Sequence, residues 1–95
     1  MAQAVNAGFS SEIVNLAVTS GGWTALSLPS RPNNMLIRLR ESGDLMVSLD
    51  AAGATFLTIP DGNSLTYDWN AGKTDNIIYL KGTVSGNAEI IVTYE

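Results

Sequence analysis

Short runs of alternating apolar and polar residues recur along the chain, and a turn-forming residue closes almost every run. Such runs, repeated at intervals of about 8 to 12 residues, are typical of small all-β domains. Gly, Pro, Asn, Asp or Ser lies between the runs, and these residues favour turns. The eight strand candidates are residues 13–19, 23–28, 35–41, 45–50, 54–59, 64–69, 76–81 and 88–94. The pattern predicts an all-β fold, an antiparallel β-sandwich of about eight strands.

The sequence divides into a short arm and one domain. Residues 1–11 mix small and polar residues with one aromatic, Phe9, and show no sustained period. We therefore expect an N-terminal arm over 1–11 and a single β-sandwich domain over 12–95. No segment has a sustained 3.6-residue period, so no helix longer than one or two turns is expected. Pattern alone leaves the strand order open between a jelly roll and an immunoglobulin-like fold.

The alternation predicts which side chains face the core. In residues 35–41, Met35, Ile37 and Leu39 point inward while Arg38 and Arg40 point outward. If this strand pairs with residues 45–50 as a hairpin, the register must keep apolar residues on one face. Such a register places Leu39 opposite Val47 and Arg38 opposite Ser48. The same reasoning points Leu57 and Ile59 inward. It points Leu65, Tyr67 and Trp69 either inward or into an interface.

The last two strands carry apolar residues on both faces. Ile77 to Leu80 form one two-sided run, and Ile90 to Val92 form the other. Two-sided apolar strands are central strands of a core, or strands whose second face is covered by another subunit. Both alternatives remain open. The second makes the C-terminal part of the chain an oligomer interface.

Composition restricts the partners. The 95 residues carry a net charge of −4 with only five Lys and Arg, which argues against a nucleic-acid partner or an anionic membrane. A chain with 45% hydrophobic and only 15% charged residues is expected to place some apolar surface against a partner. There is no Cys, no run long enough to span a bilayer and no signal-peptide pattern in the first residues. We expect a protein made and used without membrane export.

The residues suggest no catalytic site. Because His is absent, the commonest general base and the usual zinc sites are excluded. Lys73 and Lys81 are expected to be solvated at strand ends or in loops rather than buried beside a serine. The aspartates of the predicted turns and strands, Asp44, Asp50, Asp61, Asp68 and Asp75, are interpreted as turn and surface residues rather than as a carboxylate pair. No cofactor or metal ligand set is predicted, and we expect no enzyme.

Aromatic and arginine side chains are the remaining candidates for binding. A stacking platform for a sugar ring is one interpretation of Trp23, Tyr67, Trp69 and Tyr79, and a core or subunit interface is the other. Arg38 and Arg40 share an outward face. They are either anchors for a carboxylate of a neighbouring subunit or a solvated stripe.

Several phrases of the sequence resemble small virion proteins of tailed bacteriophages. They are Ala25-Leu26-Ser27-Leu28-Pro29, Met35 to Arg38 with Gly43-Asp44, Phe56 to Leu65, Tyr79 to Gly82, and Ile90 to Tyr94. The resemblance covers about three quarters of the chain. It implies a jelly-roll-like subunit of the phage particle without catalytic residues, made in the host bacterial cytoplasm.

Within that resemblance, the implied role is a capsid decoration or cement protein that binds the major capsid protein or another virion protein. A tail or neck component is the alternative, and a carbohydrate-binding module is an alternative of a different class. Decoration proteins often act as symmetric oligomers, and a homo-oligomer, with a trimer favoured, is the expectation here. The candidate interface residues are Phe9, Arg38, Arg40, Ile78, Leu80 and Ile91.

Overall fold

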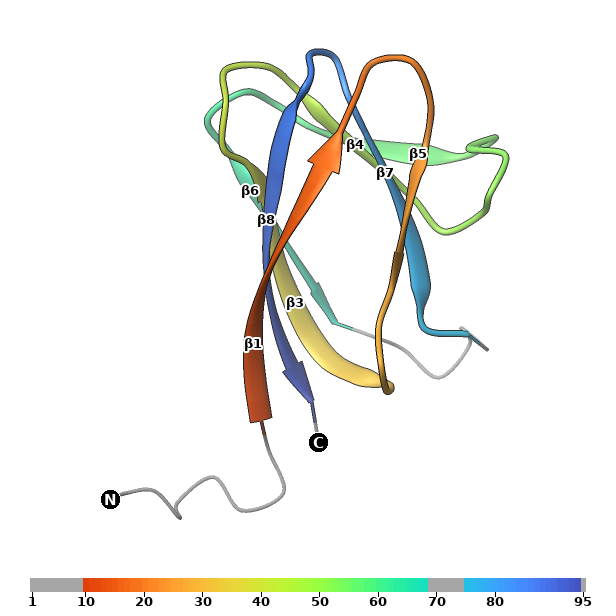
Figure 1. Cartoon of the computed structure of the whole chain (residues 1–95), viewed down its shortest axis with the longest axis vertical. Helices are drawn as coiled ribbons and strands as arrows, with labels where there is room; N and C mark the ends of the chain where they lie inside the picture. Colours follow the sequence, from red (N-terminus) through yellow and green to blue (C-terminus); the bar gives the residue numbers. More distant parts are fainter. Residues whose placement is uncertain (1–9, 69–74, 95) are drawn as a thin grey trace.

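The chain forms eight β-strands in the computed structural model, which describes residues 10–68 and 75–94 (Figure 1). The strands are β1 (Ser10–Val18), β2 (Thr24–Ser27), β3 (Pro32–Leu39), β4 (Leu45–Ser48), β5 (Phe56–Ile59), β6 (Ser64–Asp68), β7 (Ile77–Gly82) and β8 (Gly86–Tyr94). Each overlaps one predicted strand, and the all-β prediction is confirmed. Ser10 and Ser11, expected in the arm, belong to β1 instead. The described residues include no helix long and apolar enough to cross a membrane.

The strands are divided between two antiparallel sheets. Sheet A has the order β1-β8-β3-β6, and sheet B has the order β2-β7-β4-β5. Four strand pairs are therefore nested, β1 with β8, β2 with β7, β3 with β6 and β4 with β5. The outermost pair joins the first strand to the last, with Ser10 opposite Tyr94. As a result, β1 and β2 end the two sheets at one edge of the sandwich, and β5 and β6 end them at the other.

The hydrophobic core lies between the two sheets and follows the predicted alternation. Met35, Ile37 and Leu39 of β3 are buried, whereas Leu36 and Arg38 between them are exposed. The core also includes Val18, Leu26, Leu28, Leu45, Val47, Ile59, Ile78, Leu80, Ala88, Ile90, Val92 and Tyr94. Because the chain has no Cys, this packing stabilises the fold without disulfides.

The predicted hairpin of the third and fourth strands is wrong. β3 lies in sheet A between β8 and β6, whereas β4 lies in sheet B between β7 and β5. The turn that follows Leu39 carries the chain from one sheet to the other. Gly43 in this turn has φ of +141°, and a Cβ there would lie 2.9 Å from Cγ2 of Val84. A crossing and a hairpin both keep the apolar residues inward, so alternation could not distinguish them.

The two-sided apolar strands are the central strands of their sheets. β7 lies between β2 and β4, and β8 lies between β1 and β3. Ile78 and Leu80 of β7 are buried in the core, so they cannot form a surface for a partner, and we correct their assignment to the interface. Ile91 of β8 points to the outer face of sheet A and is 44% exposed.

Candidate functional site

The outer face of sheet A carries a charged row that spans three strands. Asn15 of β1 lies opposite Glu89 of β8, and Glu89 lies opposite Arg38 of β3. One carboxylate oxygen of Glu89 is 3.2 Å from Nε of Arg38, and the other accepts a hydrogen bond of 2.8 Å from Nε of Arg40. Arg40 also donates to Oδ1 of Asn15 at 3.4 Å. Both arginines therefore bind a carboxylate of their own chain, which neither sequence interpretation anticipated.

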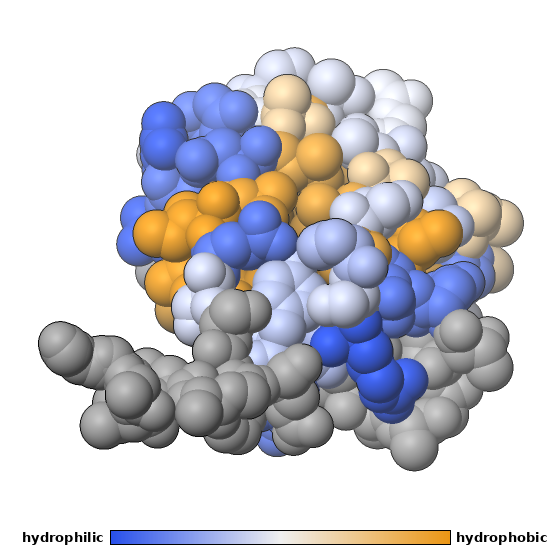
Figure 2. Space-filling model, turned by 60° about the horizontal axis from the view of Figure 1, so that its bottom comes forward, coloured by the Kyte–Doolittle hydropathy of each residue, from blue (hydrophilic) through white to orange (hydrophobic). Residues whose placement is uncertain are grey.

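An exposed apolar row lies directly beside the charged row. Ile13 of β1 is opposite Ile91 of β8, which is opposite Leu36 of β3. Ile13 is 70% exposed, Ile91 44% and Leu36 36%. The residues one step further along the same face, Ser11, Thr93 and Asn34, are polar. We call the three aliphatic residues the sheet A apolar row. On the face drawn in Figure 2, apolar surface gathers in patches bordered by hydrophilic residues.

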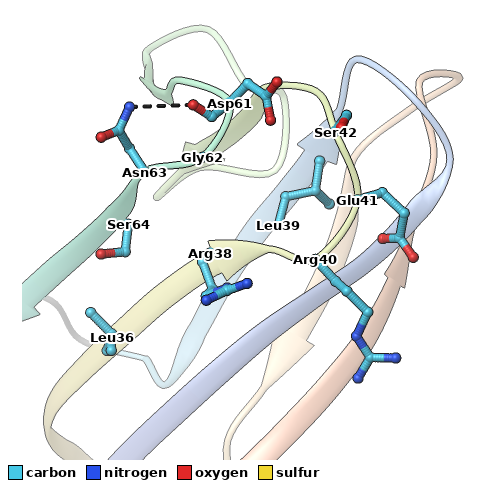
Figure 3. A pocket seen from close by; sticks show the side chains of 10 residues that line it. All are labelled: Leu36, Arg38, Leu39, Arg40, Glu41, Ser42, Asp61, Gly62, Asn63 and Ser64. Carbon is cyan, nitrogen blue, oxygen red and sulfur yellow. Dashed lines mark hydrogen bonds between the residues drawn. The ribbon is translucent and has the colours of Figure 1, made fainter.

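A polar hollow lies where the end of β3 meets the turn between β5 and β6 (Figure 3). It has a volume of about 240 Å³ and is lined by Leu36, Arg38, Leu39, Arg40, Glu41, Ser42, Asp61, Gly62, Asn63 and Ser64. Oε1 of Glu41 accepts a 2.7 Å hydrogen bond from the backbone N–H of Asn87. The carboxylates of Glu41 and Asp61 come from different turns and do not converge in Figure 3. The hollow lacks the facing carboxylates that glycoside hydrolysis requires.

The other aspartates shape turns, as the sequence predicted. Oδ1 of Asp44 accepts from the backbone N–H of Asp61 at 2.9 Å, and Oδ1 of Asp75 accepts from Ile77 at 3.3 Å. Backbone hydrogen bonds, above all the one from Ala54, lower the pKa of the Asp50 carboxyl. Residues 10–68 and 75–94 contain no group of three or more His, Cys, Asp or Glu that could hold a metal ion.

The outer face of sheet B carries an aromatic pair that the sequence analysis did not identify. The rings of Trp23 and Phe56 have centroids 5.8 Å apart at an interplanar angle of 55°. Nζ of Lys81 lies 5.9 Å from the centroid of Trp23. Phe56 lies three positions before the inward Ile59 on β5, so the two side chains point to opposite faces of the strand. This alternation could have identified Phe56 as an outer residue. Lys81 is thus half-buried beside an indole rather than fully solvated.

The predicted aromatic platform is not one surface. Trp23 belongs to the outer face of sheet B, and Tyr79 is half-buried on β7 opposite Ala25 and Ser48. Tyr67 instead packs against the core from β6. Trp69, Lys73 and Phe9 lie outside the described residues, so their predicted roles stay predictions.

An apolar cleft of about 440 Å³ opens between the sheets at the edge formed by β5 and β6. It is lined by Ile37, Val47, Leu49, Asp50, Thr55, Phe56, Leu57, Leu65, Tyr67 and Ile78, and we call it the β5–β6 cleft. Leu57, expected to point inward, lines this cleft but is 53% exposed, because β5 is the last strand of its sheet. The cleft was not predicted, since alternation does not reveal which strands end a sheet.

No family model, no curated protein and no solved structure matches this chain.

Proposed function

We propose that the protein is a structural virion protein of a tailed bacteriophage, a capsid decoration or cement protein that binds the lattice of the major capsid protein. A tail or neck component is the alternative position within the same class. The sheet A apolar row is the observation that carries the proposal. Three neighbouring strands present aliphatic side chains to solvent, in a chain that has few charged residues.

The fold supports the same role. The nested pairs β1–β8, β2–β7, β3–β6 and β4–β5 are the pairing expected of a jelly roll, the architecture that the resemblance to virion proteins implies. The described residues contain no group of three or more His, Cys, Asp or Glu that could hold a metal ion.

The size of the row indicates how binding would be achieved. Three side chains alone cover much less than the roughly 1,200–2,000 Å² of a standard protein interface. A capsid surface presents the same site many times, so an oligomer that binds several sites at once needs only modest contacts from each copy. This is the physical reason to expect a homo-oligomer on a repetitive lattice.

Labelling of phage particles tests the proposal. Particles released from the strain that encodes the gene are purified, and a gold-labelled antibody against the protein is located by electron microscopy. Label over the capsid is expected, and label on the tail or neck selects the alternative position. Purified particles that contain none of the protein, by mass spectrometry as well as by labelling, contradict the virion role.

Two substitutions then test the surface. Ile91→Asp places a charge in the sheet A apolar row and is expected to reduce the amount of bound protein per particle at least tenfold. Thr58→Asp introduces the same charge at an exposed strand position of sheet B, away from that row, and is the matched control. Equal occupancy of particles by both variants would show that binding does not use sheet A.

A carbohydrate-binding module is the second candidate, and the pair of Trp23 and Phe56 is the observation that favours it. The half-exposed ring of Phe56 beside the indole of Trp23 offers a stacking surface for sugars. Titration with a panel of oligosaccharides, followed by tryptophan fluorescence, tests this function. A saturable change that Phe56→Ala abolishes supports it, whereas an unchanged spectrum across the panel excludes it for those sugars.

A further inference from the structure

The β5–β6 cleft combines an apolar lining with two open sheet edges. Leu49, Phe56 and Leu57 line it from sheet B, and Leu65 and Tyr67 line it from sheet A. Among the strands of residues 10–68 and 75–94, β5 pairs only with β4, and β6 pairs only with β3. The short turn over residues 60–63, closed by a 3.0 Å hydrogen bond from Asn63 N–H to the Pro60 carbonyl, separates the two strands into different sheets. Each therefore has one edge that no other described strand covers.

This combination selects the chemistry of the occupant. An end strand presents backbone N–H and C=O groups that another extended chain can pair with. The apolar lining accepts the alternate side chains of such a chain, as in other cases of strand addition. The polar side chains of the lining are those of Asp50 and Thr55 and the hydroxyl of Tyr67, against seven apolar residues, and a lipid tail would leave the backbone edges unpaired. An uncharged extended peptide with apolar residues at every second position can pair with a backbone edge and also fill the apolar lining.

The chain itself contains such a peptide just before β1. Val5, Ala7 and Phe9 alternate with Asn6 and Gly8, and residues 2–9 carry no charged side chain. In an extended conformation the three apolar side chains would share one face. Because the protein as a whole has a net charge of −4, an uncharged segment can approach a second copy with little added repulsion.

We propose that residues 4–9 of one copy bind as an extended strand in the β5–β6 cleft of a second copy. β1, which follows this segment, ends sheet A at the edge opposite β6. The donated segment and the receiving cleft therefore belong to opposite edges of the sandwich. Such a contact is head-to-tail, and it closes into a ring when the rotation between copies permits. The inference does not depend on a virion role.

Cysteine cross-linking tests the contact, because the full chain contains no native Cys. An Ala7→Cys protein is mixed with a Leu57→Cys protein that carries a mass tag, and the mixture is oxidised mildly. The expected result is a disulfide-linked heterodimer on a non-reducing gel. The matched control replaces Leu57→Cys by Val84→Cys, which lies in the turn after β7 and is also partly exposed and aliphatic. We expect at least a tenfold higher yield with Leu57→Cys.

Further variants define the outcomes. Phe9→Ser in the Ala7→Cys protein is expected to lower the heterodimer yield severalfold, since it removes the largest apolar side chain of the segment. Equal yields at Leu57→Cys and Val84→Cys overturn the proposal. An Ala7→Cys/Leu57→Cys double variant that forms only an intrachain disulfide on dilution overturns it as well, because the segment would then bind its own cleft.

A second measurement leaves the cleft unaltered. The Ala7→Cys protein with a nitroxide label is mixed with native protein enriched in ¹⁵N. The label is expected to broaden the amide signals of Phe56, Leu57 and Leu65 in the native protein. Signals of Ser11 and Ile13 of β1, at the opposite edge of sheet A, should broaden least. Broadening confined to those control signals, or broadening of none, contradicts the proposal even if a cleft variant fails to fold.

Discussion

Gly53 shows how one residue without a side chain can position an aromatic cluster. Its φ is +66°, and a Cβ at this position would lie 2.1 Å from Nε1 of Trp23. The indole therefore packs against backbone and reaches Phe56 on β5. Substitutions at Gly53 act on the same surface that we consider for sugar binding.

Gly53→Ala is expected to destabilise the protein more than Gly62→Ala. Both residues have positive φ, but no atom lies within 4 Å of a Cβ built at Gly62. Gly62→Ala should thus cost about 1 kcal/mol for the backbone conformation alone. Gly53→Ala should cost about 1–3 kcal/mol more because the indole must move. Urea unfolding of both variants measures the difference, and equal losses would show that Trp23 does not pack against Gly53.

Tyr94 gives the fold a specific dependence on alkaline pH. Burial, together with a hydrogen bond from its hydroxyl to the Glu12 carboxylate and the charge of that carboxylate, raises its pKa to about 12 from the usual 10. Between these values the unfolded chain has lost the phenolic proton while the folded chain retains it. The contribution of Tyr94 to the free energy of unfolding is therefore fully present below pH 10 and is lost as pH rises from 10 to 12.

Tyr94→Phe is expected to flatten this part of the pH profile, because the titrating group is removed. Unfolding by urea at several pH values between 9 and 12 provides the measurement. The variant will have lower stability than the native protein near pH 8 if the hydrogen bond contributes, so slopes rather than absolute values are compared. Identical slopes for the two proteins would assign the alkaline loss to other groups.

At the scale of single residues, the sequence predicted the face to which a side chain points better than it predicted the groups that the side chain contacts. Alternation correctly turned Arg38 and Arg40 outward, yet it could not show that Glu89 of a distant strand binds both. Ser48 was also correctly turned away from the core, but it is buried. Its Oγ accepts from the N–H of Asp50, and its single proton is shared between the carbonyls of Asp50 and Thr55. These contacts depend on strand order and on the path of turns.

At the scale of elements, the strands were predictable and their neighbours were not. All eight strands follow local alternation and turn residues, which act over a few positions. Pairing between β3 and β8 joins segments far apart in the sequence, and no local pattern specifies it. The two-sided apolar character of β7 and β8 came closest to an indication of topology, because both are central strands of their sheets, but Ile91 on the outer face of β8 is still exposed.

The charged row on sheet A is expected to contribute modestly to the pairing of β3 with β8. Glu89→Gln removes the charge that both Arg38 and Arg40 bind, and exposed pairs of this kind contribute about 0.2–1 kcal/mol. The loss should shrink as NaCl is raised towards 1 M, since salt screens exposed charges. Asp68→Asn, at an exposed acid of the end strand β6, is the control. A loss independent of salt would indicate a packing effect instead.

At the scale of the whole molecule, the nested pairs make the fold depend on contacts between distant parts of the chain. The pair β1–β8 forms only when the first and last strands meet, and β2–β7 and β3–β6 also close large loops. We expect refolding in milliseconds to seconds, as in other proteins rich in non-local strand pairs. Stopped-flow tryptophan fluorescence after dilution from urea measures the rate. Complete refolding within microseconds would contradict this expectation.

The pairing of Ser10 with Tyr94 also determines how the domain can be joined to other proteins. A polypeptide fused before β1 and one fused after β8 would both extend from the same end of the sandwich, where Ser10 and Tyr94 are neighbours. Fusions at both ends would therefore crowd one another, whereas the turns at the far pole would stay accessible. For use as a building block, a bulky reporter belongs in an exposed turn such as the one around Ser85, not at an end.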